Sequence, residues 1–109
     1  MGMRPRPAIV ALICLAAGLG SPGVALGDAE SGKTIAKRWC GTCHIVPDAV
    51  PEVATEGIPT FRAIARNPRN TPARIAAILV DPHPPMPDFS LSNRTIADLI
   101  AYIESLAAD

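Results

Sequence analysis

Aromatic side chains, cysteines and an excess of either charge are all scarce in this chain of 109 residues. Ten basic residues balance ten acidic ones, which argues against a general polyanion binder and therefore against nucleic acid as a partner. Three cysteines are too few for a disulfide-dense scaffold. With only 4% aromatic residues to fill a core, a small domain built from this chain needs a disulfide, a metal or a cofactor.

A long apolar run occurs only near the N-terminus, at residues 8–19. Two arginines precede it, and helix-breaking glycine and proline residues and then Ala25-Leu26-Gly27 follow it. This order is typical of a secretory signal peptide, so we expect residues 1–27 to be removed and residues 28–109 to form the mature domain in the periplasm. The run is shorter than the roughly 20 apolar residues of a membrane-spanning helix, and an uncleaved anchor is the alternative.

Removal of this segment changes both the charge and the cysteine content. The segment holds two basic residues and no acidic ones, so the mature domain has a net charge of −2. Cys14 follows Ile13, where a lipidation site requires a small residue, and we assign it to the discarded segment. The mature domain then keeps only Cys40 and Cys43, in an oxidising compartment.

The mature sequence contains four helical segments separated by proline-rich loops, and it shows no period-2 alternation, which predicts an all-α fold. In the first segment, from about Ala29 to Trp39, Ile35, Ala36 and Trp39 share one face. The later segments are predicted at 60–66, at 72–80 after a Thr71 cap, and at 93–106 after a Ser92 cap. Asp98 and Glu104 fall off the apolar stripe of the last helix.

The motif Cys40-Gly41-Thr42-Cys43-His44 ends the first predicted helix, and its C-x-x-C-H spacing is that of c-type haem attachment. Two thiols three residues apart can add to the vinyl groups of neighbouring pyrroles. The next residue then lies beneath the ring centre and can offer an imidazole nitrogen to the iron. We therefore expect Cys40 and Cys43 to bind one haem covalently and His44 to be its proximal ligand. Such a haem would also fill the thin core.

Three other interpretations use the same residues. A thioredoxin-like dithiol requires a βαβ context, which the sequence does not show. A structural zinc site would need Cys40, Cys43, His44 and His83 in a tetrahedral arrangement, although Cys43 and His44 are adjacent in sequence. A plain Cys40–Cys43 disulfide would close so short a loop that it would stabilise the fold little.

Met86 is the only methionine of the mature chain, and it lies in the loop His83-Pro84-Pro85-Met86-Pro87. Most methionines fill gaps in a core. The prolines exclude a helix here, however, and a rigid loop is suited to presenting a ligand. We expect Met86 to be the distal iron ligand, which raises the reduction potential and leaves no open iron site. His83 is the rival ligand, and its simpler interpretation is an exposed loop histidine.

Together, CGTCH after the first helix, the HPPMP loop and the final segment LSNRTIADLIAYIESL resemble the class I c-type cytochromes, in particular the small periplasmic bacterial ones. The resemblance covers essentially the whole mature chain. It implies four short helices around one covalently bound haem c, with Cys40 and Cys43 as thioether anchors. It also implies His44 as the proximal iron ligand and Met86 as the distal one.

The resemblance further implies how the terminal helices meet. Gly32 matches the small residue at which they cross, and Leu99 and Tyr102 match its partners on the last helix. Ala36 stands where the family often has an aromatic residue, so the crossing is less bulky here, and Trp39 is expected to compensate for the missing bulk. A proline carbonyl is expected to orient the proximal histidine, and the candidates are Pro59 first, then Pro47 and Pro51.

The resulting expectation is a monomeric one-electron carrier between periplasmic or membrane-bound redox proteins, rather than an enzyme. One alternative is a haem c subunit of a larger oxidoreductase. A haem enzyme acting on peroxide is another, but only His83 and Asp88 could serve it as distal acid–base groups. Between residues 57 and 80 the chain has no acidic residue and four arginines, namely Arg62, Arg66, Arg69 and Arg74. These arginines could form a docking patch for an acidic partner, pair with a haem propionate, or simply make up a solvated face.

Overall fold

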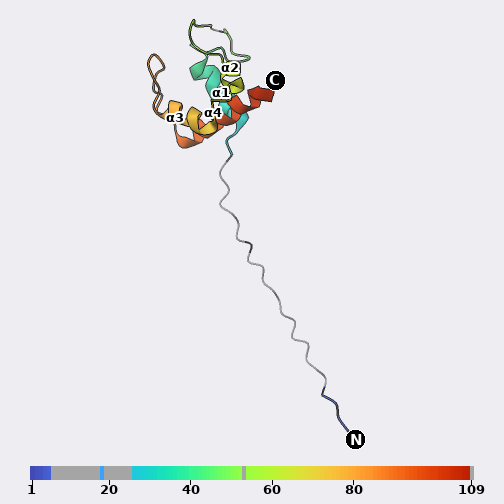
Figure 1. The fold of residues 1–109 in the computed structure, drawn as a ribbon. Helices are drawn as coiled ribbons and strands as arrows, with labels where there is room; N and C mark the ends of the chain where they lie inside the picture. The colour runs from blue at the N-terminus through green and yellow to red at the C-terminus, as the bar shows by residue number, and fades with distance from the viewer. Residues whose placement is uncertain (6–17, 19–25, 53, 109) are drawn as a thin grey trace.

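The computed structural model describes residues 1–5, 18, 26–52 and 54–108 (Figure 1). The apolar run of the expected signal peptide, apart from Gly18, falls outside the described residues, as does Ala25 of its expected cleavage site. The helical domain is described from Leu26 onward.

This domain is helical, and the residues that the structure describes contain no strand. The all-α expectation is confirmed. The elements are α1 (Ala29–Ile35), a single π-helical turn η1 (Ala36–Cys40), α2 (Phe61–Arg66), α3 (Pro72–Val80), α4 (Asn93–Ser105) and a terminal 3₁₀ turn η2 (Leu106–Ala108).

The four α-helices begin where short polar side chains can cap them. The side-chain oxygens of Asp28, Thr60, Thr71 and Ser92 each accept a hydrogen bond from a backbone N–H of the first helical turn. These bonds satisfy donors that a helix N-terminus otherwise leaves without partners. The caps expected at Thr71 and Ser92 are both present.

The first and last α-helices cross in the middle of the domain (Figure 1). Gly32 of α1 lies directly on the backbone of α4, where an added Cβ would overlap the Asp98 carbonyl and come within 2.9 Å of the Tyr102 Cβ. Only a residue without a side chain permits this approach. The crossing at Gly32 that the resemblance implied is present.

The two shorter helices pack around this crossing, α2 against α4 and η2, and α3 against α4 (Figure 1). Each offers a single fully buried side chain, Phe61 and Ile75 respectively. The largest share of the buried core comes instead from α4 and its continuation, namely Leu99, Tyr102, Ile103 and Leu106. The domain is thus organised around α4.

Two residues depart from the sequence pattern. Trp39 was expected on the buried face of the first helix but is 42% exposed and outside the buried core, because it lies at the end of the helical segment, beyond the contact between α1 and α4. Ala36, on the same segment, is fully buried. Asp98 was expected off the apolar stripe of α4 but is only 6% exposed.

Candidate functional site

The C-x-x-C-H motif forms one compact turn at the end of the first helical segment. Gly41 closes the π-turn by donating its N–H to the Ala36 carbonyl at 2.9 Å. The N–H groups of Cys43 and His44 both donate to the Cys40 carbonyl, at 3.2 and 2.9 Å. Since π-turns are frequent at functional sites, this local geometry itself singles out the motif.

The two cysteines are not joined by a disulfide, and they differ in burial. Cys43 is exposed, whereas burial raises the pKa of the Cys40 thiol to about 11. A redox dithiol needs a thiol whose pKa is lowered instead, because the thiolate is the nucleophile. The raised pKa of Cys40, together with the absence of strands from the described residues, gives the thioredoxin-like interpretation no support.

His44 is held by the segment that leads into α2. Its ring Nδ1 lies 2.6 Å from the carbonyl oxygen of Pro59, the first of the three proline candidates. A carbonyl oxygen only accepts, so Nδ1–H donates and Nε2 keeps its lone pair. Phe61 contacts the ring edge-on at a centroid distance of 5.5 Å, and its N–H donates to the Ile45 carbonyl at 3.0 Å. These contacts fix the orientation and tautomer of the imidazole.

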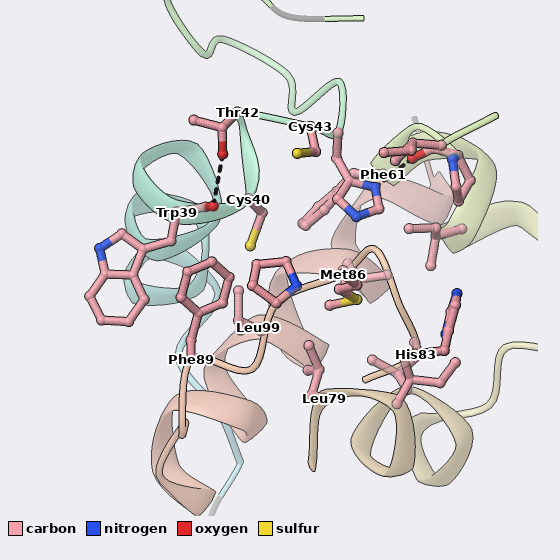
Figure 2. A pocket seen from close by; sticks show the side chains of 18 of the residues that line it. Trp39, Cys40, Thr42, Cys43, Phe61, Leu79, His83, Met86, Phe89 and Leu99 are labelled. Carbon is pink, nitrogen blue, oxygen red and sulfur yellow. Dashed lines mark hydrogen bonds between the residues drawn. The ribbon is translucent and has the colours of Figure 1, made fainter. Parts of the chain in front are cut away.

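An apolar cavity of about 290 Å³ opens beside this turn, close to the lower end of the size range of sites for small molecules and cofactors. Side chains from the motif, α2, α3, α4 and the loop after α3 line it (Figure 2). The apolar lining includes Phe61, Ile64, Ile75, Ile78, Leu79, Leu99 and Ile103. Cys40, Cys43, His44 and Met86 all line the same cavity.

Met86 reaches the cavity from the loop between α3 and α4. Its N–H donates to the His83 carbonyl at 2.9 Å, which closes a turn flanked by prolines. Met86 is half-buried, whereas His83 is exposed, although His83 also lines the cavity. Figure 2 shows Met86 across the cavity from the two cysteine side chains. The structure thus brings together residues that are 46 positions apart in the sequence, Cys40 and Met86.

Two lining residues were not singled out from the sequence. Phe89 lies against Trp39 at a centroid distance of 5.6 Å, and the two rings form one edge of the cavity (Figure 2). Asn70 lines another part of it and donates its side-chain N–H to the Ile64 carbonyl at 3.1 Å. Phe89 could have been noticed as one of only four aromatic residues, three positions after Met86. Nothing in the pattern pointed to Asn70.

The donor set fits haem c better than a bare metal ion. Among the described residues, no group of three or more histidine, cysteine, aspartate or glutamate side chains could hold a metal ion, so the four-ligand zinc arrangement is not formed. Two free thiols, one imidazole with a fixed tautomer and one thioether instead share an apolar cavity. These are the anchoring and axial groups that a covalently bound haem takes.

Comparison with known proteins agrees with this assignment. The family model described as "Cytochrome C oxidase, cbb3-type, subunit III" matches residues 27–103. Cytochrome c-552 of Bradyrhizobium diazoefficiens is 40% identical over 94 residues, which cover 86% of this chain and 89% of that protein. No solved structure matches significantly. None of the helices in the described residues has the length and apolar character of a membrane span.

The match spans nearly the whole helical domain, from the residue before Asp28 into the last turn of α4, so the expectation of a c-type cytochrome is confirmed. The family match also supports the expected haem cofactor and electron-carrier function. The chain belongs to the cytochrome c family and is an electron-transfer protein that carries covalently bound haem c with iron.

Proposed function

We propose that this protein is a one-electron carrier in which Cys40 and Cys43 anchor the haem, and His44 and Met86 are the axial iron ligands. The observation that carries the proposal is the apolar cavity that all four side chains line together. When bound, the haem supplies a one-electron Fe(III)/Fe(II) couple, so no substrate bond has to be made or broken. The chain's own residues set the potential of this couple and control access to it.

His44 contributes through the hydrogen bond that its Nδ1–H donates to the Pro59 carbonyl. This bond leaves Nε2 as the nitrogen available to iron and fixes the orientation of the ring. Phe61 restricts rotation of the imidazole from one side. A ligand fixed in this way reorganises little when the iron changes oxidation state, which is what rapid electron transfer requires.

Met86 contributes a soft thioether, which favours ferrous iron and raises the reduction potential. Its loop carries Pro84, Pro85 and Pro87, whose fixed φ angles limit how far the sulfur can move. The apolar lining of the cavity adds to this effect, because exclusion of water disfavours the extra charge of the ferric state.

We also place the protein in the periplasm as a monomer with residues 1–27 removed. The basic, apolar and small-residue order of that segment supports this proposal. Its donor and acceptor are redox proteins that dock briefly through a small interface. The exposed Trp39–Phe89 pair supports docking at that edge of the cavity, because aromatic side chains are enriched in interfaces.

A second candidate function is that of a haem c subunit in a larger oxidase. The description of the matching family names an oxidase subunit, whereas the relative from Bradyrhizobium diazoefficiens is named only as a cytochrome c. Native purification separates the two, since a subunit stays with its catalytic partner through gel filtration and a free carrier elutes alone, as a small monomer.

Absorption spectroscopy of the secreted haem protein tests the axial ligation. We expect low-spin spectra in both oxidation states and the weak red-end charge-transfer band of a Met–Fe(III) bond. Met86→Ala should keep the covalent haem, lose that band and lower the potential by a substantial part of the roughly 0.8 V that axial ligands span. His83→Ala is the matched control from the same loop. If His83→Ala removes the low-spin spectrum and Met86→Ala does not, His83 is the ligand.

A further inference from the structure

Asp98 is a buried carboxylate inside the crossing of α1 and α4, and haem binding does not use it. It is 6% exposed, whereas the other acidic side chains of the described residues lie at the surface or are only half-buried. A buried carboxylate is costly unless a charged group or several hydrogen bonds compensate for it. The sequence pattern, which placed Asp98 on the polar side of α4, gives no reason for its burial.

The shortest polar contact of Asp98 comes from the other end of the domain. The backbone nitrogen of Asp28 donates to Asp98 Oδ1 at 2.7 Å, across 70 residues of sequence. Arg94, one turn earlier on α4, approaches the same oxygen with its Nε at 3.6 Å, but its side chain is largely exposed. Asp98 therefore depends mainly on one backbone nitrogen, that of the residue just after the expected cleavage site.

The backbone at Gly27 lies against the same part of α4. An added Cβ on Gly27 would overlap the Ala97 carbonyl of α4, so the peptide between Gly27 and Asp28 lies directly on that helix. A signal peptidase also requires a small residue at this position. The peptide bond that the peptidase would cut is therefore the one whose nitrogen faces Asp98.

We propose that cleavage between Gly27 and Asp28 creates a built-in ion pair, in which the new α-ammonium of Asp28 binds the buried carboxylate of Asp98 and fastens α1 to α4. In the uncleaved chain the same nitrogen is a neutral peptide N–H. Hydrolysis of this peptide bond adds one water, leaves a carboxylate on Gly27 and gives an amine that is protonated at neutral pH. The contact becomes a charge-assisted hydrogen bond, which is roughly twice as strong as a neutral one. This inference rests on the proposed cleavage site and is independent of the haem ligands.

The surrounding charges favour a cation at this point. The carboxylate of Asp28 is already engaged in capping α1, since it accepts from the Glu30 N–H at 3.3 Å and from the Ser31 hydroxyl at 2.6 Å. Glu30 adds a further negative charge in the first turn of α1. Arg94 on α4 is the cation whose charge acts on the Asp28 carboxylate. Lys33, one turn further along α1, pairs with Asp48 instead. The carboxylates of Asp28 and Asp98 thus share one arginine until cleavage supplies a second cation.

The test begins with the intact mass of the secreted haem protein, which identifies its first residue. Thermal unfolding of the holoprotein is then measured from pH 6 to pH 10 for the mature form and for a form whose leader is moved to leave Gly27 as the first residue. We expect the mature form to melt about 4 °C higher at pH 6 to 7, as one added charge-assisted bond implies for a domain of this size. The ion pair raises the pKa of the Asp28 amine above its ordinary value of about 8. The difference in melting temperature should therefore be complete below a pH of about 8 and be lost as the pH rises through the raised pKa.

Asp98→Asn supplies the decisive comparison, because asparagine keeps the shape and one acceptor oxygen but carries no charge. In the Asp98→Asn background the two N-termini should give equal melting temperatures at every pH. Arg94→Gln is the matched control from the same helix and should leave the difference between the N-termini in place. A first residue other than Asp28 overturns the proposal. Equal melting temperatures of the two forms at pH 6 also overturn it. The proposal fails as well if the two forms still melt at different temperatures in the Asp98→Asn background. Each of these results leaves the haem spectrum, and with it the proposed axial ligands, unaffected.

Discussion

The α1–α4 crossing and the haem cavity are two regions of one small domain that are stabilised in different ways. At the crossing, backbone meets backbone at Gly32, and Ala36 and Leu99 are almost completely buried. On the cavity side, α2 and α3 each bury one side chain, and many of the remaining apolar side chains face open space. Polypeptide alone fills the first region, whereas our proposal assigns the haem to the second.

This difference shows how a short chain with few aromatic residues forms a folded domain. The crossing supplies a rigid frame, and the haem supplies the apolar volume that the side chains lack. We therefore expect changes on the two sides to have different consequences. Changes at the crossing should alter stability whatever the state of the haem, and changes around the cavity should act through haem binding.

The largest effect is expected when the haem anchors are removed. The double variant Cys40→Ala/Cys43→Ala should be purified without covalent haem and should lose most of its helical circular dichroism, because the cavity side then has no filling. The single variant Thr42→Ala, within the same motif, is the control and should keep both. Native-like helicity and a cooperative melt in the haem-free double variant would show that the two regions do not differ as described.

A large effect is also expected at the crossing itself. Gly32→Val places a branched side chain against the Asp98 carbonyl and the Tyr102 Cβ, so α1 and α4 must separate. We expect a loss of about 3 kcal/mol in the free energy of unfolding, at the upper end for overpacking, with an unchanged haem spectrum in the protein that remains folded. Chemical denaturation of the holoprotein measures this loss. Thr34→Val on the exposed face of the same helix should cost little, and equal losses for the two variants would refute the close contact.

The smallest effect is expected from a surface ion pair that connects the two regions. Lys33 of α1 lies 3.0 Å from Asp48 in the loop after the C-x-x-C-H motif, and this contact lowers the pKa of Asp48 and raises that of Lys33. Because folding lowers the pKa of the Asp48 carboxyl, the ion pair stabilises the folded state at pH values above the ordinary pKa of an aspartate. This stabilisation is lost as the pH falls through the lowered pKa. Both groups are exposed, so the effect should also disappear in high salt.

Lys33→Gln checks this expectation by thermal melts at pH 7 and pH 3. Its melting temperature should lie slightly below that of the unchanged protein at pH 7 in low salt and should equal it at pH 3. Lys37→Gln, which removes an exposed lysine on η1, is the control. A larger difference at pH 3 than at pH 7 would have the wrong sign for this ion pair.

Much of the site was predictable because its chemistry depends on local sequence. The spacing of Cys40, Cys43 and His44 specifies a turn, and the prolines around Met86 exclude a helix, so both features can be read without a structure. The resemblance implied a proline carbonyl for His44, and Pro59 was ranked first of three candidates, but the pattern alone could not exclude the other two. That choice depends on the path of the loop, which tertiary contacts determine.

The residues that were misplaced or missed share a physical reason. Trp39 was misplaced because periodicity shows a shared face but not where along the helix the contact with α4 ends, and Asp98 because its partner is 70 residues away. The pairing of Phe89 with Trp39 likewise joins two segments distant in sequence. Patterns within one helix reveal which face is apolar, but not which polar group a distant segment will cover.

The contact between α1 and α4 also has a consequence for the order of folding. It joins the first and last α-helices of the domain, so it cannot form until nearly the whole chain has been synthesised. The C-x-x-C-H motif lies early in the chain and is complete long before α4 is made. Contacts of such high sequence separation form slowly, because a long loop has to close first. We therefore expect Cys40 and Cys43, the proposed haem anchors, to stay accessible until the last helix closes the domain.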